Sequence, residues 1–202
     1  MSETVFIVDD DAAVRDSVAM LLGTVNLTTE TFTSAEDFFA GFDPNRPGCL
    51  LLDLRMPGMS GLGVQQELAQ RGSRIPIVFL TAHGDVQVAV QAMKEGAVDF
   101  LQKPFRDDEL IERIQKALEV DRRQRALEVD EANFRSRLAE LTPREKEVMD
   151  HVVAGAPNKA IAMDLGLSER TIEIHRSRVM KKMGVTSLAE LVRMVTENRT
   201  ES

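Results

Sequence analysis

The stretch CLLLDL at residues 49–54 is a continuous apolar run that is interrupted near its end by the carboxylate of Asp53. A run of this kind, without polar alternation, is typical of a strand buried on both faces of a sheet. Other short β-like runs lie at residues 5–11, 28–33, 75–81 and 97–104. Because helical stretches separate the runs, the pattern predicts a doubly wound α/β domain, with a five-stranded parallel sheet covered by helices on both faces.

Polar side chains stand where these strands end, and they comprise Asp9, Asp10, Asp11, Asp53, Thr81 and Lys103. The carboxyl ends of parallel strands meet at one edge of a sheet, so we expect these groups to lie close together. Clustered carboxylates destabilise one another unless a cation is present, and Mg²⁺ or a similar ion such as Mn²⁺ suits such an oxygen site.

An acidic run or a strand-final threonine is an ordinary structural feature when it stands alone. Their joint placement with a lysine favours a site at which Asp53 acts as a nucleophile and becomes an aspartyl-phosphate. Lys103 would supply a positive contact to the phosphoryl group, and Thr81 would hydrogen-bond one of its oxygens.

The chain from residue 143 onward shows four short helical segments and no strand pattern. Thr142 and Glu145 form a capping box with proline at the first helical position. Ser187 and Glu190 suggest a second box at the start of the last segment. This half of the chain is therefore expected to be a small helical domain.

The two middle segments predict a helix-turn-helix. The first covers residues 158–165, with Asn158 as its cap, and Gly166 ends it. The second covers residues 169–182 and begins after Ser168, which can cap it.

The second of these helices has an apolar side, where Ile172, Val179 and Met183 are expected to pack inward. Its polar side is suited to base edges and phosphates. The candidate DNA contacts are Asn158, Lys159, Arg170, Thr171, Glu173, Ile174, Arg176, Ser177, Arg178 and Lys182. A solvated amphipathic helix is the alternative, but the cap, the turn and the basic cluster together favour DNA binding.

Residues 107–140 read as a long charged helix that joins the two halves. Val120, Leu127, Phe134 and Leu141 recur every seven residues, which suggests a narrow coiled-coil seam. Polar residues between them favour a plain helical linker over a stable coiled coil. The expected organisation is an α/β domain, a linker and a helix-turn-helix domain at residues 1–120, 121–138 and 139–202.

The net charge of −8 argues at face value against DNA binding, because phosphates attract basic surfaces. The charge is unevenly distributed. Residues 1–120 carry 10 basic and 19 acidic residues, a net −9, whereas residues 170–182 carry five basic and one acidic residue, a net +4. The acidic total therefore does not exclude a DNA-binding helix.

Several other classes are excluded by the composition. No apolar run approaches the length of about 18 residues that predicts a membrane span, and the first residues lack a signal-peptide pattern. Cys49 is the single cysteine, so neither an internal disulfide nor a cysteine-based zinc site is expected. These features lead us to expect a cytoplasmic protein without membrane partners.

Four motifs in order, VFIVDDD, LLLDLRMPGMSG, VFLTAHGD and AVDFLQKPF, resemble the receiver domain of two-component response regulators. The resemblance covers residues 3–121 and implies a flavodoxin-like fold with strand order 2-1-3-4-5. It implies phosphorylation of Asp53 by a partner histidine kinase and a cis bond before Pro104. The metal ligands that it implies are Asp9, Asp10, Asp53 and the backbone carbonyl of Arg55.

The resemblance assigns further roles in signalling. Phe100 lies at the family's aromatic switch position, where the ring turns inward as Thr81 moves, and ordinary core packing is its alternative role. Arg55 and His83 lie at positions that influence hydrolysis in this family, and we hypothesise that they shape water access to the phosphoryl group. The expected dimer surface includes Val88, Gln91, Ala92 and Glu95.

Residues 137–199 resemble the LuxR-type DNA-binding domain, most clearly in GAPNKAIAMDLGLSERTIEIHRSRVMKKMGV. The two halves together are similar to NarL/FixJ-type response regulators, in particular to the FixJ branch. Glu173 departs from relatives that carry lysine there. The resemblance implies a transcriptional regulator, not an enzyme, that dimerises when phosphorylated and binds promoter DNA, with RNA polymerase as a further candidate partner.

Two other functions are compatible with parts of the pattern. A magnesium-dependent phosphatase would also use an aspartyl nucleophile, but it would need a second general acid where this chain has Arg55. An interaction module could instead use the α/β domain as a dimeriser that needs no phosphorylation. The phosphatase would leave the helical domain unexplained.

Overall fold

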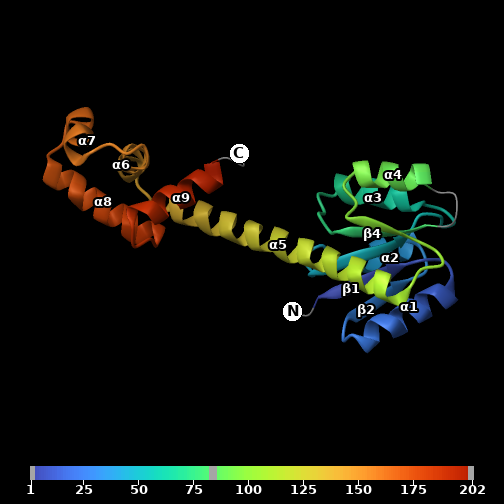
Figure 1. The fold of residues 1–202 in the computed structure, drawn as a ribbon. Helices are drawn as coiled ribbons and strands as arrows, with labels where there is room; N and C mark the ends of the chain where they lie inside the picture. Colours follow the sequence, from blue (N-terminus) through green and yellow to red (C-terminus); the bar gives the residue numbers. More distant parts are fainter. Residues whose placement is uncertain (1–2, 82–85, 200–202) are drawn as a thin grey trace. The chain divides into compact units, whose positions relative to one another are not determined.

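The protein is described by a computed structural model that covers residues 3–81 and 86–199, without the side chains of Val86, Ala89 and Arg199. It divides into two compact units, Met1–Arg125 and Ala126–Ser202. The first unit contains β1 (Thr4–Val8), α1 (Ala12–Thr24), β2 (Thr28–Phe32), α2 (Ala35–Gly41), β3 (Gly48–Asp53), α3 (Gly61–Gln70), β4 (Ile77–Thr81), α4 (Val86–Lys94) and β5 (Asp99–Gln102). Figure 1 shows how they are arranged.

The five strands form one parallel sheet in the order β2-β1-β3-β4-β5, which confirms the predicted doubly wound fold and its strand order. Helices α1 and α5 (Asp107–Ala139) contribute Val18, Leu22 and Ile114 to the core on one face. Helices α2, α3 and α4 cover the other face, where Phe38 and Leu68 are buried. Side chains of neighbouring strand residues alternate between these two cores, because successive residues of a strand face opposite sides of the sheet.

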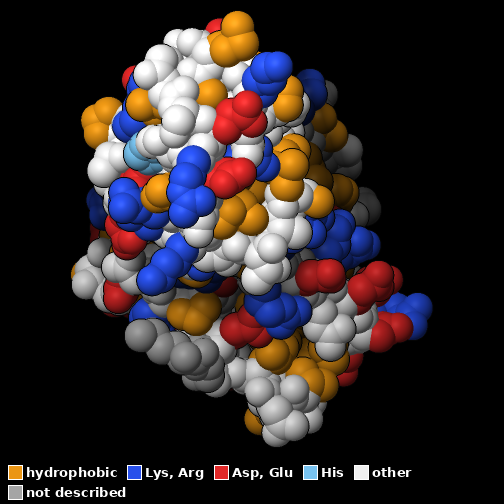
Figure 2. All heavy atoms as spheres, turned by 90° about the vertical axis from the view of Figure 1, so that its left-hand side faces the viewer, with side chains coloured by type: hydrophobic (Ala, Val, Ile, Leu, Met, Phe, Trp, Pro, Cys, Tyr) orange, Lys and Arg blue, Asp and Glu red, His pale blue; other side chains and the backbone are white. Residues whose placement is uncertain are grey.

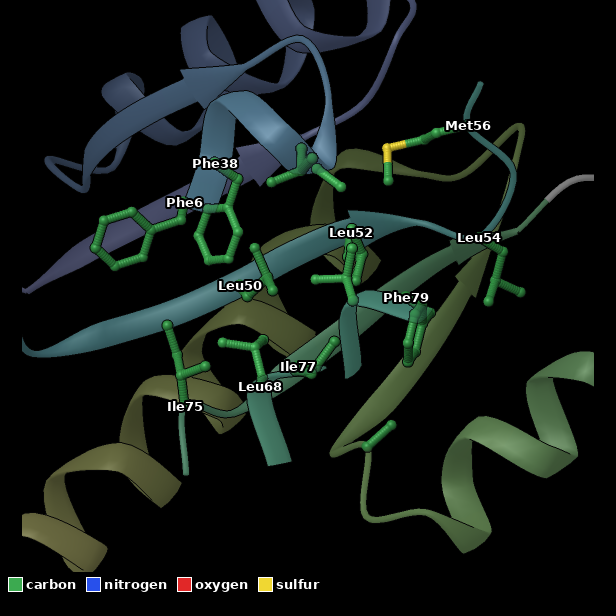
Figure 3. Close-up of a cluster of buried hydrophobic side chains, with 14 of the residues drawn as sticks. Phe6, Phe38, Leu50, Leu52, Leu54, Met56, Leu68, Ile75, Ile77 and Phe79 are labelled. Atoms are coloured by element: carbon green, nitrogen blue, oxygen red, sulfur yellow. The ribbon is translucent and has the colours of Figure 1, made fainter. Parts of the chain in front are cut away.

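Phenylalanine rings dominate one end of the second core (Figure 3). The Phe38 ring packs edge-on against Phe32 and is stacked on Phe42, with centroid distances of 5.4 and 4.7 Å. Phe6 and Phe38 point toward one another from β1 and α2. Leu50 and Phe79 from the central strands continue the same core.

The second part of α5 belongs to the other unit, because Phe134 joins the core of the C-terminal helices. That unit contains α6 (Pro143–Val153), α7 (Asn158–Leu165), α8 (Glu169–Met183) and α9 (Leu188–Arg199). Ile172, Val179 and Met183 of α8 are buried as predicted. Gly166 adopts the left-handed conformation, with φ of 64°, and ends α7 as expected.

Helix α5 is continuous over Asp107–Ala139, as the sequence predicts. Two of the four positions of the suggested coiled-coil seam are unavailable, because Phe134 and Leu141 are buried in the C-terminal core. Leu127, by contrast, is 51% exposed. The structure therefore favours the plain helical linker over the coiled coil.

One turn of α5 is bonded to the loop before β3 and to Gly48, the first residue of β3. The buried Asp121 carboxylate accepts hydrogen bonds from the Gly48 N–H at 3.0 Å and from Arg125 Nε at 2.9 Å. The Arg125 guanidinium also donates to the carbonyls of Asn45 and Arg46, at 3.0 and 2.7 Å. These bonds satisfy backbone groups at the edge of the sheet opposite Asp53, and they attach residues 121–125 to the first unit.

Two helix caps differ in detail from the sequence predictions. Asn158 does not cap α7, since the cap position is Pro157 and no side chain bonds there. Ser187 accepts from the Glu190 N–H, but the Glu190 carboxylate bonds the N–H of Thr186 instead of closing the box on Ser187. Of the two predicted capping boxes, the one at Thr142 and Glu145 is complete.

Candidate functional site

Three carboxylates and one ammonium meet at the carboxyl edge of the sheet. Asp9 and Asp10 directly follow β1, Asp53 ends β3, and each offers a carboxylate oxygen within 4.8 Å of the others. Lys103, which follows β5, places Nζ 2.7 Å from both Asp9 Oδ2 and Asp53 Oδ2. Asp10 is exposed while Asp9 and Asp53 are buried, so the cluster opens to solvent on the Asp10 side.

Thr81 lies beside this cluster at the end of β4. The Lys103 N–H donates to the Thr81 carbonyl at 2.8 Å, which holds the ends of β4 and β5 together. The peptide bond between Lys103 and Pro104 is cis, as predicted. The ends of β1, β3, β4 and β5 therefore meet at one edge of the sheet, as the sequence predicts.

The charges of the cluster fit a divalent cation. Burial raises the pKa of Asp9, although the hydrogen bonds from Lys103 and from the Asp11 N–H oppose this. Burial also tends to lower the pKa of Lys103, but its bonds to Asp53 and Asp9 outweigh this and raise it, so the ammonium stays protonated. One ammonium offsets one of three carboxylates, and oxygen donors of this kind are those that Mg²⁺ prefers.

Two neighbours of the cluster were not anticipated from the sequence. The guanidinium of Arg15, one turn into α1, donates to the Asp9 carbonyl at 2.6 Å. A Cβ atom at Gly61 would lie 2.5 Å from the Asp53 carbonyl oxygen, so α3 can begin this close to β3 only with glycine. In the sequence, Gly61 is marked only by being a glycine at the end of the segment RMPGMSG that follows Leu54. No local pattern marks Arg15.

The remaining residues near this edge have separate roles or positions. Asp11 caps α1 by accepting from the Ala13 N–H at 2.8 Å, and it is no part of the cluster. The Arg55 N–H donates to Asp53 Oδ1 at 3.1 Å, while its side chain is exposed. His83 lies outside the described residues, so its suggested influence on hydrolysis stays a prediction.

Phe100 is 40% exposed and belongs to neither core of the sheet. Its neighbours Asp99 and Leu101 point inward instead, and the buried Asp99 carboxylate pairs with Arg113 and Lys116 of α5 at 2.8 and 3.0 Å. The alternative of ordinary core packing for Phe100 is therefore wrong in this structure.

The surface expected for dimer formation needs one correction. Ala92 is fully buried in the core beneath α4 and cannot belong to an exposed surface. Gln91 and Glu95 are exposed and bonded to each other at 2.5 Å, and Val88 packs partly against the core. The large apolar side chains that are exposed here are Val90, Met93 and Phe100.

Helix α8 exposes the polar side predicted for DNA contact. Arg170, Glu173, Ile174, Ser177 and Arg178 are exposed there, and Lys159 is exposed on α7. Figure 2 shows lysine and arginine side chains interspersed with acidic and apolar ones. Within the C-terminal unit, the outer side of α8 is therefore exposed.

Four of the candidate contacts have partners within the domain. Thr171 Oγ1 lies at hydrogen-bond distance, 2.8 Å, from Ser168 Oγ, and the other three are Asn158, Arg176 and Lys182. Arg176 Nη1 donates to Asn158 Oδ1 at 2.9 Å, which joins α8 to the start of α7. Lys182 Nζ lies 2.7 Å from the buried Glu145 carboxylate and 3.0 Å from the Glu140 carbonyl. Lys182 thereby fixes the end of α8 against the start of α6.

This ion pair predicts a pH dependence of stability. The hydrogen bond from Lys182, followed by that from the Thr142 N–H, lowers the pKa of Glu145 to about 2. A carboxyl group whose pKa is lowered by folding stabilises the protein above its unfolded pKa and loses this effect as the pH falls toward the folded pKa. We expect about 1–3 kcal/mol of the unfolding free energy of the C-terminal unit to disappear between about pH 5 and 2.

Urea unfolding of the full chain, followed by NMR signals of α6 and α8 at several pH values, measures this loss. Glu145→Gln should remove most of it, whereas Glu147→Gln, at an exposed position of the same helix, should leave it unchanged. Equal pH profiles for wild type and Glu145→Gln would show that the pair is not its source.

The acidic cluster at the sheet edge and the exposed helix-turn-helix together define a signal receiver joined to a DNA-binding domain. The chain belongs to the response regulators, since residues 5–115 match the response regulator receiver domain and residues 139–195 match the bacterial regulatory proteins of the luxR family. It is a phosphorylation-dependent transcription regulator. No described helix is long and apolar enough to cross a membrane.

Relatives along nearly the whole chain support this assignment. The transcriptional regulatory protein FixJ of Rhizobium meliloti is 48% identical over 191 residues, which is 95% of this chain and 94% of FixJ. The transcriptional regulatory protein TdiR of Thauera aromatica is 44% identical over 96% of this chain and 86% of its own. These relatives are transcriptional regulators and not enzymes, which contradicts the phosphatase alternative.

Solved structures show the same likeness. The response regulator StyR superposes with a TM-score of 0.89 and 41% identity, over 98% of this chain and all of that one. Full-length FixJ from B. japonicum has a TM-score of 0.61 and 39% identity, over 99% of both chains.

Proposed function

We propose that Asp53 accepts a phosphoryl group from a sensor histidine kinase. The observation that carries this proposal is the contact of Lys103 with both Asp9 and Asp53 inside a cluster of three carboxylates. Asp9, Asp10, Asp53 and the Arg55 carbonyl would hold Mg²⁺ or Mn²⁺. When bound, the cation neutralises negative charge on the group being transferred.

The residues of the chain supply the remaining chemistry. A carboxylate oxygen of Asp53 attacks phosphorus while the P–N bond to the kinase histidine breaks. With its other ring nitrogen protonated, the histidine leaves as neutral imidazole. The ammonium of Lys103 contacts this carboxylate before the transfer. After it, the same ammonium can pair with the negatively charged phosphoryl oxygens. The buried Thr81, which ends the neighbouring strand, would then hydrogen-bond the product.

Signal output would follow from a change at α4 and β5. Movement of Thr81 would admit the exposed Phe100 ring toward the interior and alter the surface that also carries Val90 and Met93. A dimer formed there would bring two helix-turn-helix domains onto paired half-sites of promoter DNA. RNA polymerase as a further partner and a cytoplasmic location stay predictions, as do the hydrolytic roles of Arg55 and His83.

The domain boundaries belong to the same proposal. The receiver would cover residues 1–120, the linker 121–138 and the helix-turn-helix domain 139–202. The first residues of this linker, 121–125, are attached to the receiver side by Asp121 and Arg125.

Dimerisation on phosphorylation is the test of this output step. We expect sedimentation velocity of the full chain to show a monomer without a phosphoryl mimic and a dimer with beryllium fluoride and Mg²⁺. Met93→Asp should weaken the dimer, because it places a charge in the apolar surface, while Met20→Asp, at an exposed position on α1, serves as the matched control. A chain that stays monomeric with the mimic would contradict this part of the proposal.

A further inference from the structure

Glu173 is the one acidic residue of the segment 170–182. Arg170, Ile174, Ser177 and Lys181 lie near the middle of the exposed side of α8, at spacings that place them opposite the buried Ile172 and Val179. Glu173 borders this stripe and is exposed. Among the described residues it has no hydrogen bond or ion pair within the domain, so its carboxylate is available to a ligand.

An unpaired carboxylate at this position opposes DNA binding in general. The phosphates carry one negative charge per about 1.7 Å of duplex, and they repel an acidic side chain that approaches the groove. The repulsion is offset only where the carboxylate meets a hydrogen-bond donor. A carboxylate accepts hydrogen bonds and donates none, so acceptor groups of the bases cannot offset it.

The major groove offers two such donors on the base edges, the amino groups of cytosine N4 and adenine N6. Adenine presents its amino group beside the N7 acceptor, which repels a carboxylate, whereas cytosine itself presents only the donor. We propose that Glu173 is a specificity-determining residue that reads a cytosine in each half-site through the N4 amino group. This inference rests on the proposed DNA binding through α8.

Selection of bound duplexes from a randomised library tests the proposal, using the full chain treated with a phosphodonor. Wild type should select cytosine at one position of each half-site. Glu173→Ala should reduce that preference about tenfold or more and leave the other positions unchanged. Glu173→Gln should shift the preference toward adenine, because glutamine pairs with adenine N6 and N7.

The matched control is Glu197→Gln, which removes the same charge from an exposed position on α9 and should keep the wild-type preference. Circular dichroism of each variant checks that α8 stays folded. If wild type binds selected DNA and Glu173→Ala keeps the same cytosine preference, the role of Glu173 is refuted while DNA binding stands. If wild type selects no DNA, the proposed function fails as well.

Discussion

Asp53→Asn is expected to abolish phosphorylation of the chain by acetyl phosphate and Mg²⁺. Asparagine keeps the shape of the side chain, but its amide oxygen is a poor nucleophile and it removes one of the three carboxylates that converge at the sheet edge. Intact-protein mass spectrometry should show the addition of one phosphoryl group to wild type and none to the variant. The aspartyl-phosphate should also be lost on treatment with hydroxylamine.

The matched control for this experiment is Asp11→Asn. Asp11 lies two residues from Asp9 but caps α1, a role that asparagine also fills. Phosphorylation of the Asp11→Asn variant should therefore match that of wild type. Phosphorylation of Asp53→Asn at the wild-type rate would show that the acceptor lies elsewhere, and loss in both variants would point to a general disturbance of the fold.

Phe38→Ala is expected to reduce the unfolding free energy of the receiver by about 3–5 kcal/mol. The ring is fully buried and contacts Phe6, Phe32 and Phe42, so alanine removes an apolar side chain and leaves a cavity. Figure 3 shows the ring within this core. Urea unfolding followed by circular dichroism measures the loss.

Phe100→Ala makes the same chemical change at a ring that is 40% exposed and outside both cores of the sheet. This variant should cost less than about 1 kcal/mol, as is usual for substitutions away from the core. Similar losses for the two variants would mean that the aromatic core contributes no more than an exposed surface ring.

The sheet and the acidic site could be predicted because their signals are local. Apolar runs identify strands, and the parallel order of strands places Asp9, Asp53 and Lys103 at one edge without any long-range information. Residue-level exposure was less predictable. Ala92 was expected on the surface, but its small side chain lies on the inner side of α4.

Contacts between residues far apart in the chain account for the other differences. Lys182 lies within a basic cluster, yet its partner Glu145 is 37 residues away in sequence. Asn158 was expected to cap its own helix, and instead it bonds Arg176 in the next one. Phe100 faces outward since Asp99 occupies the inner position, where cations from α5 satisfy it.

The bonds from Asp121 and Arg125 to the loop before β3 bear on how this receiver could be recombined with other output domains. A gene fusion made after residue 120 removes both side chains, so the Gly48 N–H and the carbonyls of Asn45 and Arg46 lose their partners. A fusion made after Arg125 retains them. The receiver that evolution or a designer can exchange intact therefore ends at Arg125, about one helical turn after residue 120.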